Sequence, residues 1–212
     1  GGEPLTWEPL AGAPAAAAAT ERNLYKSLLG HSLVFEEIRH DLGLGFRYRW
    51  TGCDAFGWVR SATLENRGDR PVRLTLLDGL RNVLPYGAPL ALYQQASNLV
   101  DAYKRTDVDA ESGLGIFSLT AGITDRAEAL EVLRANTVWC CGLEGFRVHL
   151  ASDAVERFRA GRVLADERVL TGGRGNYLVS ASLDLAPGAS ARWHLAGDTG
   201  RDHVQIAALR QR

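Results

Sequence analysis

The feature that most constrains the fold is an alternation of apolar and polar side chains in short runs. In residues 44–50, LGFRYRW, the side chains of Leu44, Phe46, Tyr48 and Trp50 share one face, while two arginines lie on the other. Six further runs have strand character: 58–66, 71–77, 136–143, 146–152, 177–185 and 190–197. One-sided alternation is typical of antiparallel sheets with one solvated face, so the sequence predicts a mainly β protein, an antiparallel β-sandwich with one or two short helices.

Two turn sequences predict β-hairpins. NRGDRP, residues 66–71, contains Gly68, which tolerates positive φ, and Pro71, which opens the next strand. LAPGAS, residues 185–190, turns around Pro187 and Gly188. We therefore expect the strands on either side of each turn to pair with each other.

Three segments have helical signals. Residues 20–30, TERNLYKSLLG, begin with Thr20 as a helix cap and end at Gly30. Residues 90–104, LALYQQASNLVDAYK, repeat apolar side chains every three or four positions and predict a long amphipathic helix. Residues 199–212 predict a C-terminal helix without a stop signal.

These elements define three regions. Residues 1–30 are a linker or N-terminal extension with a short helix, residues 31–197 the β-sandwich domain, and residues 198–212 the start of a linker helix leading to a further domain. The sequence contains no methionine, and its last helix lacks a stop signal. We expect it to be a piece of a longer polypeptide, and the alternative is a fully processed small protein.

Composition argues against two classes of partner. Lysine and arginine (24) balance aspartate and glutamate (25), so no basic field draws the chain to nucleic acid. No run of 18 apolar residues predicts a membrane span. Cys53, Cys140 and Cys141 do not form a disulfide framework, and the last two are predicted to be reduced thiols on a strand. A reducing, cytoplasmic location is favoured.

The sequence predicts no catalytic residue, metal site or cofactor. It has no GxSxG motif, and its histidines show neither HExxH nor a zinc-ligand spacing. The glycines of LGLG and TGGRG precede strands and are expected in loops. Glu36, Glu37, Asp78 and Glu144 are candidate acid/base groups, although each is more typical of a surface carboxylate or turn cap.

A weaker signal is the polar, mostly uncharged face of the 90–104 helix and the loop before it. A contact with a ligand or another domain needs an apolar wall with a few fixed polar groups. The candidate contact residues are Arg81, Asn82, Tyr86, Gln94, Asn98, Asp101 and Lys104. The alternative is an ordinary solvated helix lying across a sheet edge.

The run FGWVRSATLENRGDRPVRLTLLDGLRNVLPYG, residues 56–87, resembles a known family. It is similar to the N-terminal β-super-sandwich of inverting disaccharide phosphorylases and related bacterial glycoside hydrolases of the cellobiose-phosphorylase type. Residues 191–209, ARWHLAGDTGRDHVQIAAL, resemble the last sandwich strand and the linker helix that enters an (α/α)6 barrel. The resemblance covers roughly residues 31–212 and implies a galactose-mutarotase-like sandwich. The 90–104 helix departs from the family pattern.

In that family the catalytic carboxylate lies on the barrel, so no catalytic residue is transferred to this chain. The resemblance implies a non-catalytic domain of a glycoside hydrolase or phosphorylase. Its partner would be the (α/α)6 catalytic domain of the same polypeptide, with an oligosaccharide and a homodimer as further partners.

Two alternatives remain. The first is a stand-alone aldose-epimerase-like enzyme in which His149 or His194 exchanges protons with Glu144. The second is a carbohydrate-binding module that stacks sugars on tryptophans; the candidates are Trp50, Trp58, Trp139 and Trp193. Because these tryptophans lie on strand faces, the sequence favours a role in core packing.

Overall fold

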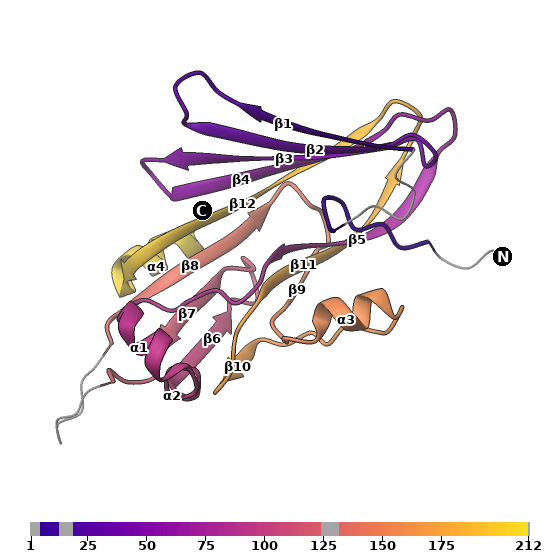
Figure 1. Ribbon diagram of the computed structural model, residues 1–212. Coiled ribbons are helices and arrows are strands. Elements are labelled where there is room, and N and C mark those ends of the chain that lie inside the picture. Colours follow the sequence, from indigo (N-terminus) through magenta and orange to yellow (C-terminus); the bar gives the residue numbers. More distant parts are fainter. Residues whose placement is uncertain (1–4, 13–18, 124–131, 212) are drawn as a thin grey trace. The chain divides into compact units, whose positions relative to one another are not determined.

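The computed structural model describes residues 5–12, 19–123 and 132–211 (Figure 1). Within these ranges the chain is mainly antiparallel β and forms two sheets, which confirms the predicted sandwich class. The larger sheet has nine strands in the order β1-β2-β3-β4-β12-β8-β7-β6-β10, and the smaller has three in the order β5-β11-β9. No helix in the described part of the chain is long and apolar enough to cross a membrane.

The strands and helices have the following bounds. The larger sheet contains β1 (Thr20–Lys26), β2 (Ser32–Arg39), β3 (Leu44–Cys53), β4 (Gly57–Asn66), β6 (Lys104–Val108), β7 (Gly115–Leu119), β8 (Arg134–Cys141), β10 (Val169–Thr171) and β12 (Ser190–Asp202). The smaller sheet contains β5 (Val72–Leu80), β9 (Arg147–His149) and β11 (Tyr177–Leu185). The helices are α1 (Leu90–Gln95), α2 (Ser97–Tyr103), α3 (Ala154–Arg159) and α4 (His203–Arg210).

The chain divides into two compact units. The first comprises Gly1–Leu76, Cys141–Leu143 and Ser182–Leu195, and the second comprises Leu77–Cys140, Glu144–Ala181 and Ala196–Arg212. Four strands, β5, β8, β11 and β12, cross from one unit to the other along their length. Each unit is therefore described by itself.

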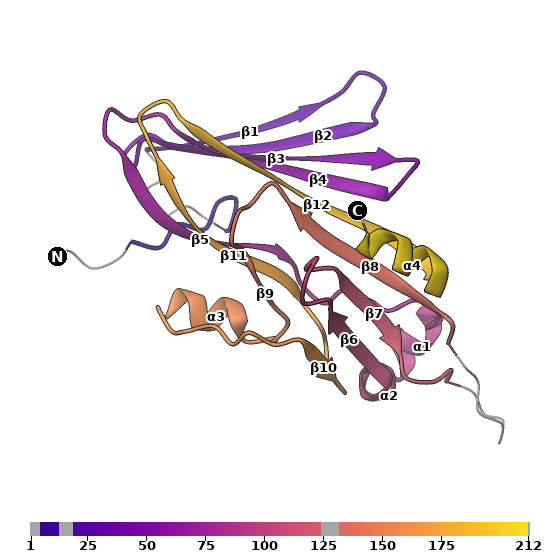
Figure 2. The ribbon, with the colours of Figure 1, turned by 180° about the vertical axis from the view of Figure 1, so that it is seen from behind.

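In the first unit, β1, β2, β3 and β4 form an antiparallel meander and run side by side in both views (Figures 1 and 2). The helix predicted over residues 20–30 is wrong, because residues 20–26 are strand β1. Leu24 and Tyr25 lie opposite Phe35 and Val34 of β2, so backbone pairing with β2 replaces the hydrogen bonds of a helix.

The predicted strands on either side of the 66–71 turn exist, but the hairpin pairing is wrong. β4 lies in the larger sheet and β5 in the smaller, and the same holds for β12 and β11 around the 185–190 turn. Both turns are corners that lead from one sheet to the other. The side-chain amide of Asn66 holds them together by donating to the backbone oxygens of Arg70 at 2.7 Å, Leu185 at 3.0 Å and Ala186 at 3.1 Å.

The core of the first unit lies along one face of this meander. Its buried side chains include Phe46, Leu64 and Trp193, and the rings of Phe46 and Trp193 are 6.1 Å apart. Buried Ile38, the register partner of Gly45, lies on the opposite face. Alternation places Phe46 and Leu64 on the same face, because they are register partners on β3 and β4.

In the second unit, the prediction of one continuous helix over residues 90–104 is wrong. The chain breaks at Ala96, whose φ of −142° and ψ of 50° are not helical, and the segment forms the short helices α1 and α2. Lys104 already begins β6. Only Val100 is buried among the residues of the two helices.

The predicted C-terminal helix is confirmed as α4. It begins at His203 rather than at residue 198, because β12 continues to Asp202. Asp202 caps the helix: its carboxylate accepts from the Gln205 amide at 2.9 Å, and the Gln205 side chain accepts from the Asp202 amide at 3.0 Å.

Candidate functional site

An aromatic face lies on one side of the β1–β4 meander. It consists of Phe35 on β2, Tyr48 and Trp50 on β3, and Trp58 on β4, which period-two alternation and strand register place on the same side. The Phe35 and Tyr48 rings stack with centroids 5.1 Å apart, and the Arg60 guanidinium carbon lies 4.4 Å from the centre of the Tyr48 ring. This face continues the row that begins with buried Phe46, 6.1 Å from Tyr48.

The aromatic face ends in a groove of about 240 Å³. The groove is lined by Gly30, His31, Ser32, Leu33, Trp50, Thr51, Gly52 and Trp58. The Trp50 and Trp58 rings lie 5.1 Å apart at an interplanar angle of 54°, so they form a tilted pair rather than one flat platform. Both residues are partly exposed to solvent.

The turn between β1 and β2 makes the same end of the meander strongly apolar. Leu28 is 105% exposed and Leu29 is 87% exposed, and Leu33 of the groove is also exposed. Gly30 closes this turn with φ of 74°, a conformation that favours glycine, and its amide donates to the Ser27 oxygen at 2.9 Å. We call Leu28 and Leu29 the leucine turn.

The prediction that the strand tryptophans are buried is correct for one of the four candidates. Trp193 is buried, at 1% exposed, whereas Trp50, Trp58 and Trp139 are partly exposed. Alternation assigns Trp50 and Trp58 to the apolar face, but at their end of the strands that face is open to solvent. The structure therefore leaves these two tryptophans partly exposed, which the sequence pattern did not favour.

Glu37 is the strongest departure from the expected surface carboxylates. Its side chain is buried, at 1% exposed, on the same face as Phe35. It accepts hydrogen bonds from the Trp7 indole at 2.7 Å, the Leu10 amide at 2.9 Å and Arg22 Nε at 2.8 Å. Burial favours the neutral carboxyl, but these three donors outweigh it and hold the pKa of Glu37 below its ordinary value of 4.5.

The predicted contact residues all belong to the second unit, where two of them meet. Buried Lys104 donates to Asp101 at 2.8 Å, and Arg174 reaches the other oxygen of Asp101 at 3.1 Å. Lys104 also lies 5.2 Å from the centre of the Tyr93 ring. The buried Tyr93 hydroxyl has no hydrogen-bond partner within the described ranges, and burial raises the pKa of Tyr93 to about 12. Lys104 thus belongs to an internal ion cluster.

The other predicted contact residues do not gather around one cavity of the described structure. Asn82 adopts φ of 51°, and its amide donates to the Asn176 side chain at 2.9 Å. Tyr86 lies beside Gly200, where an added Cβ would come within 2.9 Å of the ring. Arg81, Gln94 and Asn98 are exposed. Their exposure agrees with the alternative given above, in which this segment is an ordinary solvated helix.

The candidate proton-transfer residues have different surroundings. His149 is buried, with Nδ1 2.6 Å from the Ala165 oxygen and Nε2 2.7 Å from the Ser180 hydroxyl. The carbonyl can only accept, so Nδ1 carries the hydrogen and Nε2 accepts from Ser180. His194, in the first unit, has Nδ1 2.8 Å from the Ser61 hydroxyl. Glu144 is exposed in the loop before β9.

Neither the cysteines nor a metal cluster provide a reactive centre in the described ranges. Cys53, Cys140 and Cys141 are free thiols, as predicted. Desolvation raises the pKa of the Cys141 thiol although the residue is exposed, which is the opposite of what nucleophile activation needs. No group of three histidine, cysteine or acidic side chains is arranged to hold a metal ion in the part of the chain that the structure describes.

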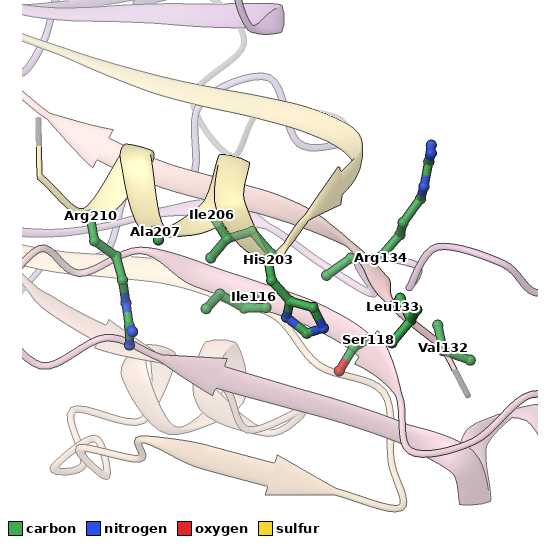
Figure 3. A pocket seen from close by; sticks show the side chains of 10 residues that line it. Ile116, Ser118, Val132, Leu133, Arg134, His203, Ile206, Ala207 and Arg210 are labelled. Carbon is green, nitrogen blue, oxygen red and sulfur yellow. The ribbon is translucent and has the colours of Figure 1, made fainter.

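A second pocket, of about 280 Å³, lies in the second unit between α4 and strands β7 and β8 (Figure 3). The His203 ring reaches toward Ile116 and Ser118, while the Arg134 guanidinium points away from the pocket (Figure 3). Arg210, at the end of α4, pairs with Asp109 at 2.6 Å. The pocket offers an apolar floor with an imidazole at its edge.

Comparison with known proteins gives distant structural neighbours only. No protein-family model and no curated protein matches the chain. A crystal structure of heparinase III is 11% identical, with a TM-score of 0.44, and the match covers 86% of this chain and 22% of that one. A putative aldose 1-epimerase from Klebsiella pneumoniae is 12% identical, with a TM-score of 0.35, over 91% of this chain and 56% of the other. Neither is a cellobiose-phosphorylase-type enzyme, so that resemblance stays a prediction.

Proposed function

We propose that this chain is a non-catalytic β-sandwich domain of a larger carbohydrate-active enzyme. The observation that carries the proposal is the open apolar end of the β1–β4 meander, where the leucine turn and the Trp50–Trp58 groove lie together. A contiguous exposed apolar patch on a soluble domain marks a surface that contacts something else.

The leucine turn is the part of this surface that suits a neighbouring domain. Leu28 and Leu29 are aliphatic side chains that lie almost fully in solvent, and burying both would contribute about 3–6 kcal/mol of hydrophobic stabilisation. We propose an (α/α)6 catalytic barrel of the same polypeptide as the neighbour, in line with the family resemblance of residues 56–87 and 191–209. The groove would then lie at the edge of that contact.

The surroundings of His149 argue against the aldose-epimerase alternative. A general base must reach the proton that it removes, yet this imidazole is buried and both of its nitrogens are engaged. His194 has one partner, Ser61, and is the better remaining candidate for that alternative.

The domain-packing proposal is tested in the parent enzyme by replacing Leu28 and Leu29 together with aspartate. The matched control is Val163→Asp, which changes an equally exposed aliphatic side chain in the second unit. The proposal expects the double variant to lower the melting temperature of the parent and its activity, while the control leaves both unchanged. Identical behaviour of the double variant and the control would contradict it.

The catalytic alternative has its own assay. Purified chain is added to α-glucose, α-galactose and a set of disaccharides with phosphate, and mutarotation, hydrolysis and phosphorolysis are followed. We expect rates equal to those of the buffer. A rate above buffer that disappears in His194→Ala would establish the enzyme alternative instead.

A further inference from the structure

We infer that the groove beside Trp50 and Trp58 binds a neutral sugar chain by stacking pyranose rings on the two indoles. The inference rests on the proposed function and extends it by naming the ligand class. It commits to a neutral oligosaccharide as the occupant.

The first argument is the arrangement of the two indoles. Trp50 lies on β3 and Trp58 on the neighbouring antiparallel strand β4. Gly52 follows Trp50 by two residues on β3, on the same face, and is the register partner of Trp58. Because side chains two residues apart point to the same side, Trp50, Gly52 and Trp58 surround one spot of the sheet. The two rings touch, with centroids 5.1 Å apart at a 54° tilt, and so form one angled apolar surface at this spot.

The second argument is the empty position at Gly52. A Cβ built on Gly52 would meet no atom within 4 Å, and its φ lies outside the range that disfavours other residues. The glycine is therefore required neither by close packing nor by backbone conformation. The missing side chain leaves the surface beside the paired indoles open to a ligand.

The third argument is the polarity of the groove. A pyranose ring presents an apolar C–H face to an aromatic wall, and its hydroxyls need a few polar partners at the rim. His31, an exposed lining residue, carries an imidazole. Ser32 and Thr51 also line the groove, but as register partners their side chains alternate to the opposite face from Trp50. None of the lining residues is a carboxylate, a lysine or an arginine, and Arg60, the register partner of Trp50, is buried with its guanidinium over the Tyr48 ring. The groove lining therefore offers no charged side chain to an acidic sugar.

The arrangement also fits the proposed place of the domain. The leucine turn joins directly to Gly30 and His31 of the groove. A sugar chain held by the tryptophans would run beside the surface that the neighbouring domain covers. This would make the groove an outlying substrate contact rather than a reaction site.

The test is a titration of the 212-residue chain with a panel of neutral oligosaccharides: cellohexaose, maltohexaose, xylohexaose and mannohexaose. A heparin hexasaccharide is the acidic comparison. Tryptophan fluorescence and calorimetry report binding. We expect at least one neutral oligosaccharide to bind and the acidic one to bind at least tenfold more weakly.

Three variants locate the site. Trp50→Ala and Trp58→Ala each remove one indole of the pair, and Gly52→Leu fills the open space beside the pair without strain on the backbone. Each is expected to weaken binding by about tenfold or more, which corresponds to about 1.4 kcal/mol. The control is Tyr25→Ala, which removes an exposed aromatic side chain of the same unit. Circular dichroism and thermal melting confirm that each variant is folded.

The outcomes separate this inference from the proposed function. Absence of binding to every neutral oligosaccharide at millimolar concentration, preference for the heparin hexasaccharide, or unchanged affinity in Gly52→Leu would overturn the sugar site. The leucine-turn variant of the parent enzyme reports on domain packing independently of any sugar. Absence of sugar binding together with a destabilising leucine-turn variant would overturn the sugar site and leave the domain-packing proposal supported.

Discussion

The indole of Trp7 donates a hydrogen bond of 2.7 Å to Oε1 of Glu37, thirty residues further along the chain. The other carboxylate oxygen accepts from Leu10 and Arg22, and Arg22 also donates to the backbone oxygens of Ala11 and Gly12. A single buried carboxylate thus holds residues 7–12 against the β1–β4 meander.

This carboxylate predicts an acid-sensitive contribution to stability. The pKa of Glu37 is held below 4.5, so its stabilising effect is fully present above that pH and is lost as the pH falls through the lower pKa of the folded state. Glu37→Gln should reduce the free energy of unfolding at neutral pH by about 2 kcal/mol and flatten its dependence on pH below 4.5.

Urea unfolding at neutral and acidic pH measures this effect. Glu36→Gln is the matched control, because Glu36 is the neighbouring carboxylate and contacts Asn23 and Tyr25. Equal losses in the two variants, or a pH dependence of Glu37→Gln that matches the parent, would refute the role given to Glu37.

A second prediction concerns the corner residue Asn66. Its buried side chain donates to three backbone oxygens and accepts from the Gly68 amide at 3.0 Å. Asn66→Ala removes these four hydrogen bonds, of which the one to the Leu185 oxygen is buried, and should lower the free energy of unfolding by about 3 kcal/mol. Asn98→Ala, at an exposed position of α2, should change it by less than about 0.5 kcal/mol. Similar unfolding midpoints for the two variants would count against the corner model.

The ion cluster of the second unit gives a third prediction. Burial opposes ionisation of Asp101, but Lys104 and Arg174 lower its pKa below the ordinary 3.8. Asp101→Asn leaves the Lys104 ammonium buried without its carboxylate and should cost about 3 kcal/mol. Asp166→Asn removes an exposed pair with Arg168 and should cost less than about 1 kcal/mol. Chemical denaturation measures both, and equal effects would show that Lys104 gains little from Asp101.

A fourth prediction assigns His149 to stability rather than to catalysis. Ser180→Ala removes the donor to His149 Nε2, and His149→Phe removes both hydrogen bonds. Each variant should lower the free energy of unfolding, by about 1–3 kcal/mol, whereas His40→Ala, at an exposed position, should have little effect. A fully stable His149→Phe chain would reopen a functional role for this imidazole.

Much of the fold could be predicted from alternation alone. Every predicted strand run contains a strand, because period two reports directly which side chains face the core. Strand pairing could not be predicted, since the turns at 66–71 and 185–190 suit a hairpin and a corner equally well by local sequence. The corner is stabilised by hydrogen bonds from the Asn66 side chain to residues more than a hundred positions away, which local sequence does not report.

The candidate site was harder to predict for a related reason. Alternation places Trp50 and Trp58 on the apolar face, but it does not report whether that face is covered at their end of the strands. Leu28 and Leu29 lie in a segment that was predicted to be helical, but the structure shows strand β1 followed by a turn. Two adjacent exposed leucines before a glycine were the available signal.

The central claim is that this chain works as a domain of a larger carbohydrate-active enzyme, and the native polypeptide tests it most directly. An antibody raised to the chain is used to blot and to deplete a lysate of the source cells. The account predicts a band well above 23.0 kDa, and loss of a glycoside hydrolase or phosphorylase activity from the depleted lysate. A band at 23.0 kDa, with all such activities left in the lysate, would contradict it.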